Sequence, residues 1–483
     1  MLEHLHNPQQ TRRHVISHPA LYTDYYELTM AQGYVLEGRA EQTATFDYFF
    51  RDLPFNGGYV LFAGISDLLK LLDEYRFGPE ELAWLKEQGF KEPFLDYLGD
   101  MELELDILSV QEGEVVFPRE PLVRVEGPVV QAQLLETLLL NILNFESLIA
   151  TKASRMTQAA GSGKVLDFGL RRAQGYGGLQ ASKAAIIGGV EATSNSLSAF
   201  LHGTPASGTM AHSWVQSFDT ELESFRAFAR CYPDNSVLLV DTYDTLRSGM
   251  PNAIKVAHEM EERGNRLKGI RLDSGDLAYF SRKAREMLDE AGLGYVKIAV
   301  SNQLDERLIK SLLDQGAPVD LFGVGTRLVT GHESPALDGV YKLAAIDGDP
   351  RLKISENIEK ITLPGRKKVL RYTDGRGRFY GDGIVLEEDV QADTIYHPYY
   401  PAKHTAISGY DAEELMQPVM EGGRQTAGDA TAQESADYAS RRLEKLMPEH
   451  KRFENPHIYK VGIGGSLMDL RDELTRQIKK QSN

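Results

Sequence analysis

Apolar and polar residues alternate along residues 101–128, which read MELELDILSVQEGEVVFPREPLVRVEGP. This period of two, punctuated by Gly and Pro, is typical of short strands that bury one face. From Gln131 to Ala160 the spacing of apolar residues becomes helical and predicts an amphipathic helix or a pair of helices. The apolar residues that carry this spacing are Leu134, Leu135, Leu138, Leu139, Ile142 and Leu143. The change of period predicts a domain boundary near residues 130–150.

Beyond this boundary, strand-like apolar runs alternate with helical patterns. The runs are VLDFGL, SVLLVDTYD, LKGIRLDSGD, VKIAVSN and VDLFGVGT. Such alternation is typical of βα units and predicts a parallel sheet that is covered on both faces. Polar residues stand at the ends of the runs: Asp167, Arg171 and Arg172; Asp241 and Asp244; Arg271, Asp273 and Asp276; Ser301 and Asn302; and Thr326. Because the loops after parallel strands converge at one edge, we expect the functional site there.

The last part of the chain has a different character. From about Asp338 onward, turns rich in Gly and Pro separate strand-like segments such as KKVLRYTDGRGRFYGDGIVL. Residues 411–442 are polar and rich in Ala, Glu and Gln, and we interpret them as helix and loop. A length of 483 residues is more than one ordinary core serves. We therefore expect two or three domains, or one large α/β barrel with additions.

Composition excludes several functional classes. The chain is 42% hydrophobic, 9% aromatic and 25% charged, as is usual for a soluble globular protein. A net charge of -17 argues against broad binding to nucleic acid or to an anionic membrane, so anionic substrates must meet local arginines and lysines. Cys231 is the only cysteine, which excludes an intrachain disulfide and a cysteine-based zinc cluster. With no apolar leader or long apolar window, these features predict a cytoplasmic protein.

Two glycine-rich stretches do not meet the requirements of nucleotide-binding motifs. GSGK at 161–164 lacks the first glycine of a phosphate loop, and Val165 replaces the Ser or Thr that would hold magnesium. GIGGSL near residue 462 lacks the third glycine of a dinucleotide fingerprint. We interpret both as turns.

Three other stretches combine glycine with charge at strand ends. LDFGLRRAQGYGG at 166–178 could hold phosphates with forked arginines and backbone amides, or its arginines could form surface salt bridges. GIRLDSGDL at 269–277 contains a helix cap, but two carboxylates and an arginine also suit a hydroxylated, phosphorylated ligand with magnesium. DLFGVGTRLVT at 320–330 is either a tight turn or a loop whose N–H groups bind a phosphate.

His212 lies in GTPASGTMAHSWVQSF, beyond a run of small residues. Taken alone it would be interpreted as a structural histidine. Its position in a βα-type segment, in a chain with arginines and aspartates at equivalent strand ends, also allows a phosphoryl acceptor.

Together, these stretches resemble nicotinate phosphoribosyltransferase, a type II phosphoribosyltransferase. The motifs that carry the resemblance are TDYYELTMAQGY, FGLRRAQG, GTMAHSW, LVDTYDTLRSGMPNAI, GIRLDSGDL, VSNQLDE, FGVGTRLVT and GVYKLAAI. The resemblance implies an irregular α/β, TIM-like barrel with an N-terminal β-containing α+β domain and a C-terminal extension. It assigns domains to residues 1–145, 146–340 and 341–483, and a homodimer with the site at the subunit interface.

The resemblance also implies the reaction and its participants. Nicotinate, 5-phosphoribosyl 1-pyrophosphate and ATP would give nicotinate mononucleotide, pyrophosphate, ADP and phosphate, with Mg²⁺ as cofactor, in the salvage branch of NAD biosynthesis. In family members a histidine of the GTxAH segment is transiently phosphorylated, and His212 matches it. His212 and Asp273 would be catalytic, while the Mg²⁺ ligands stay unassigned.

Binding roles are likewise implied by the resemblance. Tyr26 would stack on the pyridine ring, plausibly from the neighbouring subunit, and Thr209 and Arg271 would contact nicotinate. Those expected to bind phosphoribosyl pyrophosphate are Arg171, Asp273, Gly325 and Thr326. Many members carry Pro-Asp after RRAQG, whereas this chain has Tyr176 and one residue fewer. Relatives that use nicotinamide carry an acid where Met210 stands, which favours nicotinate.

Other functions compete with this interpretation. Nicotinamide or quinolinate phosphoribosyltransferases share the fold, although quinolinate would need a second basic pocket that we do not find. A catalytically silent nucleotide-binding relative is a further alternative, but Arg271, Asp273 and His212 are all present. A barrel lyase or aldolase would need an activated lysine, and Lys164, Lys297 and Lys342 have no marked setting.

Overall fold

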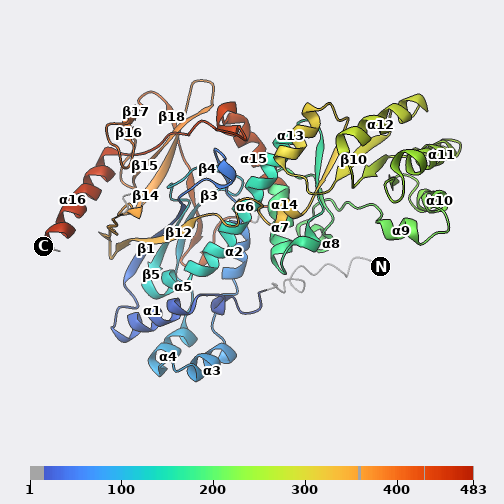
Figure 1. Cartoon of the computed structure of the whole chain (residues 1–483). Coiled ribbons are helices and arrows are strands. Elements are labelled where there is room, and N and C mark those ends of the chain that lie inside the picture. The colour runs from blue at the N-terminus through green and yellow to red at the C-terminus, as the bar shows by residue number, and fades with distance from the viewer. Residues whose placement is uncertain (1–15, 357–359, 429, 482–483) are drawn as a thin grey trace. The chain divides into compact units, whose positions relative to one another are not determined.

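The computed structural model describes residues 16–356, 360–428 and 430–481. The chain forms two compact units (Figure 1). The first comprises Met1–Leu148, Ala336–Ala430 and Tyr438–Asn483, and the second Ile149–Pro335 and Thr431–Asp437. Most of the C-terminal segment thus belongs to the same unit as the N-terminal segment, and the three-domain division at residues 145 and 340 stays a prediction.

The first unit contains a seven-stranded sheet in the order β13-β12-β1-β5-β3-β19-β20, in which all neighbours are antiparallel. Its strands are β1 (Thr43–Phe50), β3 (Asp106–Val110), β5 (Val123–Pro128), β12 (Gly339–Ile346), β13 (Asp349–Pro350), β19 (Met416–Glu421) and β20 (Arg424–Gln425). The short strands predicted within 101–128 are confirmed as β3, β4 (Val115–Val116) and β5, and β4 pairs with β2 (Val60–Leu61).

The helix pair predicted over 131–160 is also confirmed, as α5 (Val129–Leu134) and α6 (Glu136–Ala160). No Gly or Pro interrupts the 25 residues of α6. The helix ends before Gly161, whose positive φ of 59° suits the left-handed turn that follows many helices. The sequence therefore sets both the length and the end of this helix.

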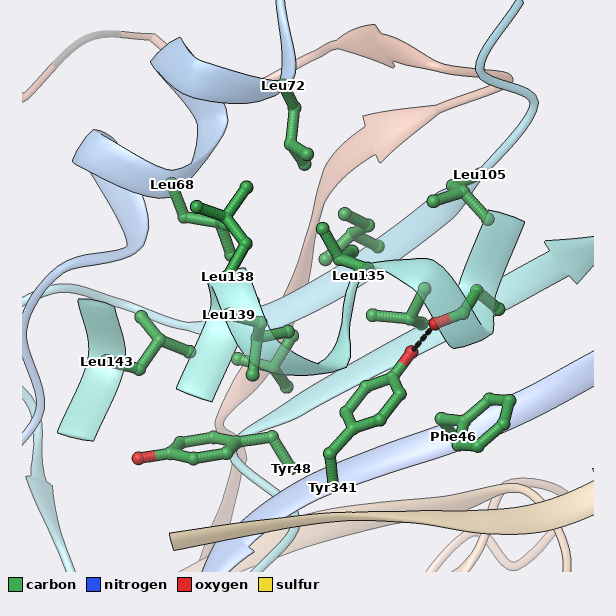
Figure 2. Close-up of a cluster of buried hydrophobic side chains, with 14 of the residues drawn as sticks. Phe46, Tyr48, Leu68, Leu72, Leu105, Leu135, Leu138, Leu139, Leu143 and Tyr341 are labelled. Carbon is green, nitrogen blue, oxygen red and sulfur yellow. Dashed lines mark hydrogen bonds between the residues drawn. The ribbon is translucent and has the colours of Figure 1, made fainter. Parts of the chain in front are cut away.

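The core of the first unit lies between these helices and the seven-stranded sheet. Figure 2 shows Leu138, Leu139 and Leu143 of α6 in one buried cluster with Tyr48 of β1 and Tyr341 of β12. The Tyr341 hydroxyl donates to the Ala132 carbonyl over 2.9 Å, so the polar end of this buried ring is satisfied.

A second sheet of the first unit has the order β17-β16-β21-β15-β14-β18. Its strands are β14 (Lys367–Thr373), β15 (Phe379–Leu386), β16 (Thr394–Tyr396), β17 (His404–Ala406), β18 (Asp411–Glu414) and β21 (Val461–Ile463). The interpretation of 411–442 as helix and loop is wrong for its first part, which forms β18 and β19. Pairing of β19 with β3, which places Met416 opposite Val110, outweighs the polar composition of this segment.

The remaining long helices surround these sheets in sequence. They are α1 (Tyr25–Leu36), α2 (Ile65–Leu72), α3 (Pro79–Glu87), α4 (Glu92–Asp100), α15 (Ala432–Lys445), which passes between the units, and α16 (Gly465–Gln481). Among the helices that the structure describes, none has both the length and the apolar character to cross a lipid bilayer.

The second unit is built on a six-stranded sheet in the order β7-β6-β11-β10-β9-β8, and all neighbouring strands are parallel. The strands are β6 (Lys164–Asp167), β7 (Ala192–Thr193), β8 (Val237–Leu239), β9 (Gly269–Leu272), β10 (Lys297–Ser301) and β11 (Leu321–Val324). All five strand-like runs of the βα pattern are confirmed, whereas the two-residue strand β7 was too short to predict.

Helices follow the parallel strands. They are α7 (Gly177–Ile187), α8 (Ser196–His202), α9 (His212–Gln216), α10 (Glu221–Cys231), α11 (Met250–Glu261), α12 (Leu277–Glu290), α13 (Glu306–Asp314) and α14 (Thr326–Val329). The mixed α/β class is therefore confirmed. A closed TIM-like barrel is not, because β7 and β8 end the sheet and do not pair with each other in the described part of the chain.

Candidate active site

A cavity of about 550 Å³ lies in the second unit, at the edge where the parallel strands end. Seven of the eight residues predicted for the site line it: Arg171, Thr209, His212, Arg271, Asp273, Gly325 and Thr326. The structure also places Phe168, Arg172, Ser194, Met210, Asn302 and Gln303 in its wall. The convergence of loops after parallel strands, predicted from the sequence, thus brings these residues together.

Arg271 projects from β9 and is largely buried. Its Nη1 donates to Oγ1 of Thr209 over 2.5 Å, while its Nε is buried without a hydrogen-bond partner among the described residues. Burial lowers the pKa of Arg271, an effect that Asp273 and Asp241 oppose and Arg171 reinforces. The guanidinium nevertheless stays charged, as arginines do in proteins. An unpartnered buried N–H on a cation that lines a cavity is suited to bind an anion.

Asp273 is held in place by two neighbours. Oδ2 of Asp241, in the loop after β8, accepts the Asp273 backbone N–H over 2.7 Å and the Ser274 hydroxyl over 2.8 Å. The hydroxyl of Ser301 donates to Oδ1 of Asp273. Oδ1 of Asp241 is buried and has no partner in the described part of the chain. From the sequence, Asp241 and Ser301 were noted only as polar strand ends, so their support of Asp273 was missed.

His212 is the first residue of α9. Its Nδ1 lies 3.1 Å from the hydroxyl oxygen of Thr242, and its Nε2 lies 3.9 Å from Oδ2 of Asp273. The His212 side chain is 41% exposed and lines the cavity. A nitrogen that reaches a solvent-filled cavity favours a chemical role over the alternative of a structural histidine.

A buried polar network supports the loop that carries Arg171. The carboxylate of Asp167, the last residue of β6, accepts the Gly169 N–H over 2.7 Å and the hydroxyls of Ser182 and Thr193 over 2.8 and 2.7 Å. Asp167 is fully buried, so it holds the turn and does not meet a ligand. Arg171 follows in a 3-10 turn, Leu170–Arg172, and is exposed.

The glycines after β11 allow a close approach of the neighbouring loop. A Cβ atom on Gly323 would lie 2.5 Å from the ring of Phe168, so only glycine fits there. Gly325 and Thr326 continue from this point along the cavity wall. The glycines predicted to be a tight turn or a phosphate loop therefore have a packing role in at least one position.

A second cavity, of about 590 Å³, adjoins the first along the same sheet. The two share Phe168, Gly208, Thr209, Arg271 and Gly323 in their walls. Arg271 and Thr209 thus lie at the junction of the cavities, away from the mouth that Arg171 and Thr326 border. A planar ligand with an anionic group would find its anion partner at this junction.

The described residues contain no group of three or more His, Cys, Asp or Glu side chains that could enclose a metal ion. Mg²⁺ does not require one, because proteins usually hold it by one or two carboxylates together with substrate phosphates. Asp273 faces the cavity and Asp241 lies behind it with an unpartnered oxygen. The donor set fits Mg²⁺ that arrives with a phosphorylated substrate.

Tyr26 is the predicted site residue that belongs to the first unit. It lies on α1, and its side chain is half exposed. Partial burial raises the pKa of Tyr26, and the neighbouring Glu27 raises it further. Tyr22, Tyr25 and Met30 are also exposed, so this part of α1 carries an apolar surface.

Family models match nearly the whole chain. The model for the N-terminal domain of nicotinate phosphoribosyltransferase matches residues 21–144, that for the nicotinate phosphoribosyltransferase family matches residues 163–386, and that for the C-terminal domain matches residues 366–471.

Curated relatives and solved structures agree with these matches. Nicotinate phosphoribosyltransferase of Bacillus subtilis is 41% identical over 96% of both chains, and that of Dictyostelium discoideum is 37% identical over 93% of this chain and 87% of its own. The crystal structure of human nicotinic acid phosphoribosyltransferase has a TM-score of 0.83 at 32% identity, covering 94% of this chain and 99% of its own. Nicotinate-nucleotide pyrophosphorylase from Pyrococcus furiosus, at 23% identity and a TM-score of 0.71, covers 90% of this chain and 98% of its own and shares the fold.

Proposed function

Because this chain belongs to the nicotinate phosphoribosyltransferase family, we propose that the cavity of its second unit joins nicotinate to 5-phosphoribosyl 1-pyrophosphate. The products are nicotinate mononucleotide and pyrophosphate, in the salvage of nicotinate for NAD. The observation that carries this assignment is the buried Arg271, whose Nε has no partner in the described part of the chain and which lies where two cavities meet.

The pyridine ring of nicotinate binds near this junction. Its carboxylate accepts hydrogen bonds from Arg271 and from Thr209, which the 2.5 Å bond between them already holds side by side. Phe168 offers an aromatic wall on one side. Met210 supplies no acceptor for an amide group, which favours nicotinate over nicotinamide.

Phosphoribosyl pyrophosphate occupies the mouth of the cavity. Arg171 faces the pyrophosphate, the Gly325–Thr326 turn receives the 5-phosphate, and Asp273 meets the ribose hydroxyls or the metal. Asp273 and Asp241 would hold Mg²⁺, which when bound offsets the charge that develops on the departing pyrophosphate.

Bond breaking at C1 of the ribose leaves positive charge on the sugar and negative charge on pyrophosphate. Arg171 stabilises the leaving group, and Arg271 with Thr209 holds the pyridine nitrogen in line with C1. The nitrogen then forms the new bond, so no covalent bond between sugar and enzyme is needed. The protein acts mainly by position and charge.

His212 couples the reaction to ATP. A nitrogen of its neutral imidazole attacks the γ-phosphorus, the bond from that phosphorus to the β–γ bridging oxygen breaks, and ADP leaves. Water later takes the phosphoryl group from His212 and releases phosphate. The exposed position of His212, 3.9 Å from Asp273, supports this role because the phosphorylated ring would act directly on the substrate site.

The active enzyme is a homodimer in this proposal, with Tyr26 of one subunit reaching the cavity of the other. Two exposed apolar surfaces support it. Leu197, Phe200 and Leu201 share one face of α8, which follows the cavity residue Ser194, and Tyr26 lies on the exposed part of α1. Its location in the cytoplasm stays a prediction from the sequence.

Product formation from phosphoribosyl pyrophosphate and Mg²⁺ tests the assignment, with nicotinate, nicotinamide or quinolinate, each with and without ATP. Nicotinate alone should give mononucleotide, and ATP should increase the rate with release of ADP. Turnover of another pyridine only would contradict the roles of Arg271 and Met210. Absence of turnover with all three would favour a silent nucleotide-binding protein.

A further inference from the structure

An ion pair behind the cavity joins two of the loops that form its wall. Oδ2 of Asp305 accepts a hydrogen bond from Nη1 of Arg327. Asp305 follows the loop after β10, and Arg327 directly follows Thr326 after β11. These two strands are parallel neighbours, with Ser301 opposite Gly323. The pair therefore ties together loops that leave adjacent strands, although neither residue lines the cavity.

The loop between Ser301 and Asp305 has a backbone that must be held. Asn302 and Gln303 have φ values of 98° and 48°, in the left-handed region that residues other than glycine rarely adopt. Both line the cavity. Such conformations persist only where the surroundings fix them. Here the hydrogen bond from Ser301 to Asp273 fixes one end of the loop, and Asp305 fixes the other.

Asp305 is a rigid attachment point. Its Oδ1 caps α13 by accepting the Leu308 N–H over 2.8 Å, and its side chain is only 3% exposed. The next residue, Glu306, pairs with Lys152 and Arg155 of α6, each over 2.8 Å, and all three are buried. Because Asp305 is fixed from below, its bond to Arg327 positions the backbone that carries Thr326.

We propose that Asp305 and Arg327 are positioning residues that hold the loops after β10 and β11 in the shape that binds phosphoribosyl pyrophosphate. The inference rests on the proposed function, which assigns Gly325 and Thr326 to that substrate. A binding site that is held in advance saves the ordering of its loops at the moment of binding. Without the pair, the strained loop relaxes and this substrate loses affinity more than nicotinate does.

Charge makes the clamp sensitive to pH once Arg327 is removed. The charged groups near Asp305 are Arg327, Lys152, Glu306 and Arg155. Burial alone would raise the pKa of Asp305, but the Leu308 N–H, Arg327 and Lys152 together hold it below its ordinary value. Loss of Arg327 moves this pKa upward, so protons should then compete for the Asp305 carboxylate as the pH falls.

Steady-state kinetics of the full-length enzyme tests the clamp with R327Q and R327K. R327Q should raise KM for phosphoribosyl pyrophosphate about tenfold while changing kcat and KM for nicotinate less than about threefold. The increase should be greater at pH 6 than at pH 8. R327K, which keeps a charge but not the fork, should raise this KM about threefold. R226Q, which removes the Arg226–Glu259 pair between α10 and α11, is the matched control and should change none of these values.

An unchanged KM for phosphoribosyl pyrophosphate in R327Q, or an equal rise in both KM values, would overturn the clamp. T326A separates the two levels of inference. If T326A raises this KM and R327Q does not, the site assignment stands and the clamp falls. If neither variant changes it, the proposed substrate site is wrong as well. Thermal unfolding of each variant identifies general instability, and R327K then carries the test.

Discussion

Nη1 of Arg271 donates to Oγ1 of Thr209 over 2.5 Å, which fixes one edge of a buried guanidinium at the junction of two cavities. The Nε edge is left without a partner among the described residues. Lysine could supply the charge at this position but not the fork. The geometry thus predicts that Arg271 selects a planar carboxylate, and not any anion.

Replacing Arg271 with lysine should lower kcat/KM for nicotinate about 10- to 100-fold, because at least one hydrogen bond to a charged group is lost. KM for phosphoribosyl pyrophosphate should change little. Initial rates at varied concentrations of each substrate measure both effects. A comparable loss for both substrates would contradict the assignment of Arg271 to nicotinate.

Replacing His212 with alanine should abolish the stimulation by ATP and the release of ADP, since no phosphoryl acceptor remains. Slow turnover without ATP should persist because Arg271, Thr209 and Asp273 are intact. Labelling with γ-³²P-ATP, followed by alkaline denaturation that preserves phosphohistidine, provides a direct measurement. Retained labelling of H212A would place the phosphoryl group elsewhere.

Replacing Asp241 with asparagine should lower kcat/KM for phosphoribosyl pyrophosphate about tenfold and raise the Mg²⁺ concentration needed for half-maximal rate. The carboxylate that accepts the Asp273 N–H and the Ser274 hydroxyl becomes a neutral amide, so Asp273 is held less firmly. D244N is the matched control, since Asp244 caps the following turn outside the cavity. An equal effect of both substitutions would argue against a specific role of Asp241.

Co-expression of Y26A and R271A chains tests the shared site of the proposed homodimer. If Tyr26 serves the partner's cavity, half of randomly formed dimers are mixed and each contains one intact site, which restores about a quarter of wild-type activity. Co-expression of R271A with T326A is the control, because both residues line the same cavity and every site carries a defect. Activity no higher than that of the separate variants would place Tyr26 in its own subunit's site or outside the site.

The stability of the first unit should depend on pH through Glu27, which is fully buried on α1. Burial raises its pKa to about 7, while Gln133 and Tyr26 oppose the rise and Glu136 adds to it. The folded protein then binds more protons than the unfolded chain between about pH 4.5 and 7. Stability should therefore fall as the pH rises through this window and stay low above it.

Glu27→Gln removes this penalty and should stabilise the first unit by about 2 kcal/mol at pH 8, with little gain at pH 5. Urea unfolding followed by the fluorescence of Trp84, on α3 of the same unit, measures the difference. Glu37→Gln, at the exposed end of α1, is the control and should show no such dependence on pH. The same gain at both pH values would exclude titration of Glu27 as the cause.

The βα part of the fold could be predicted because its pattern is local. Each buried strand is a short apolar run with punctuation, and polar residues mark the edge where parallel strands end. The same rule indicated the neighbourhood of Arg271, Asp273 and Thr326. Their roles came from the resemblance to a family, because residue type alone left surface salt bridges, caps and turns as alternatives.

Features that depend on distant pairing were less accessible. Residues 411–421 form strands because β19 finds β3, a partner remote in the chain, and not because of their composition. The hydrogen bonds of Asp241 to the Asp273–Ser274 turn and the Asp305–Arg327 pair likewise join separate loops. Closure of the barrel failed as a prediction for a related reason, since a count of βα units does not reveal whether the two edge strands meet.

The order of the strands in the first unit has a consequence for how the ribosome delivers this protein. β1 emerges early, but its neighbour β12 is made only after almost the whole of the second unit, and β19 later still. The second unit is almost one continuous segment and needs only a few residues from further along the chain. The half that is synthesised first is thus completed last, and its unpaired strand edges need protection from other nascent chains until translation ends.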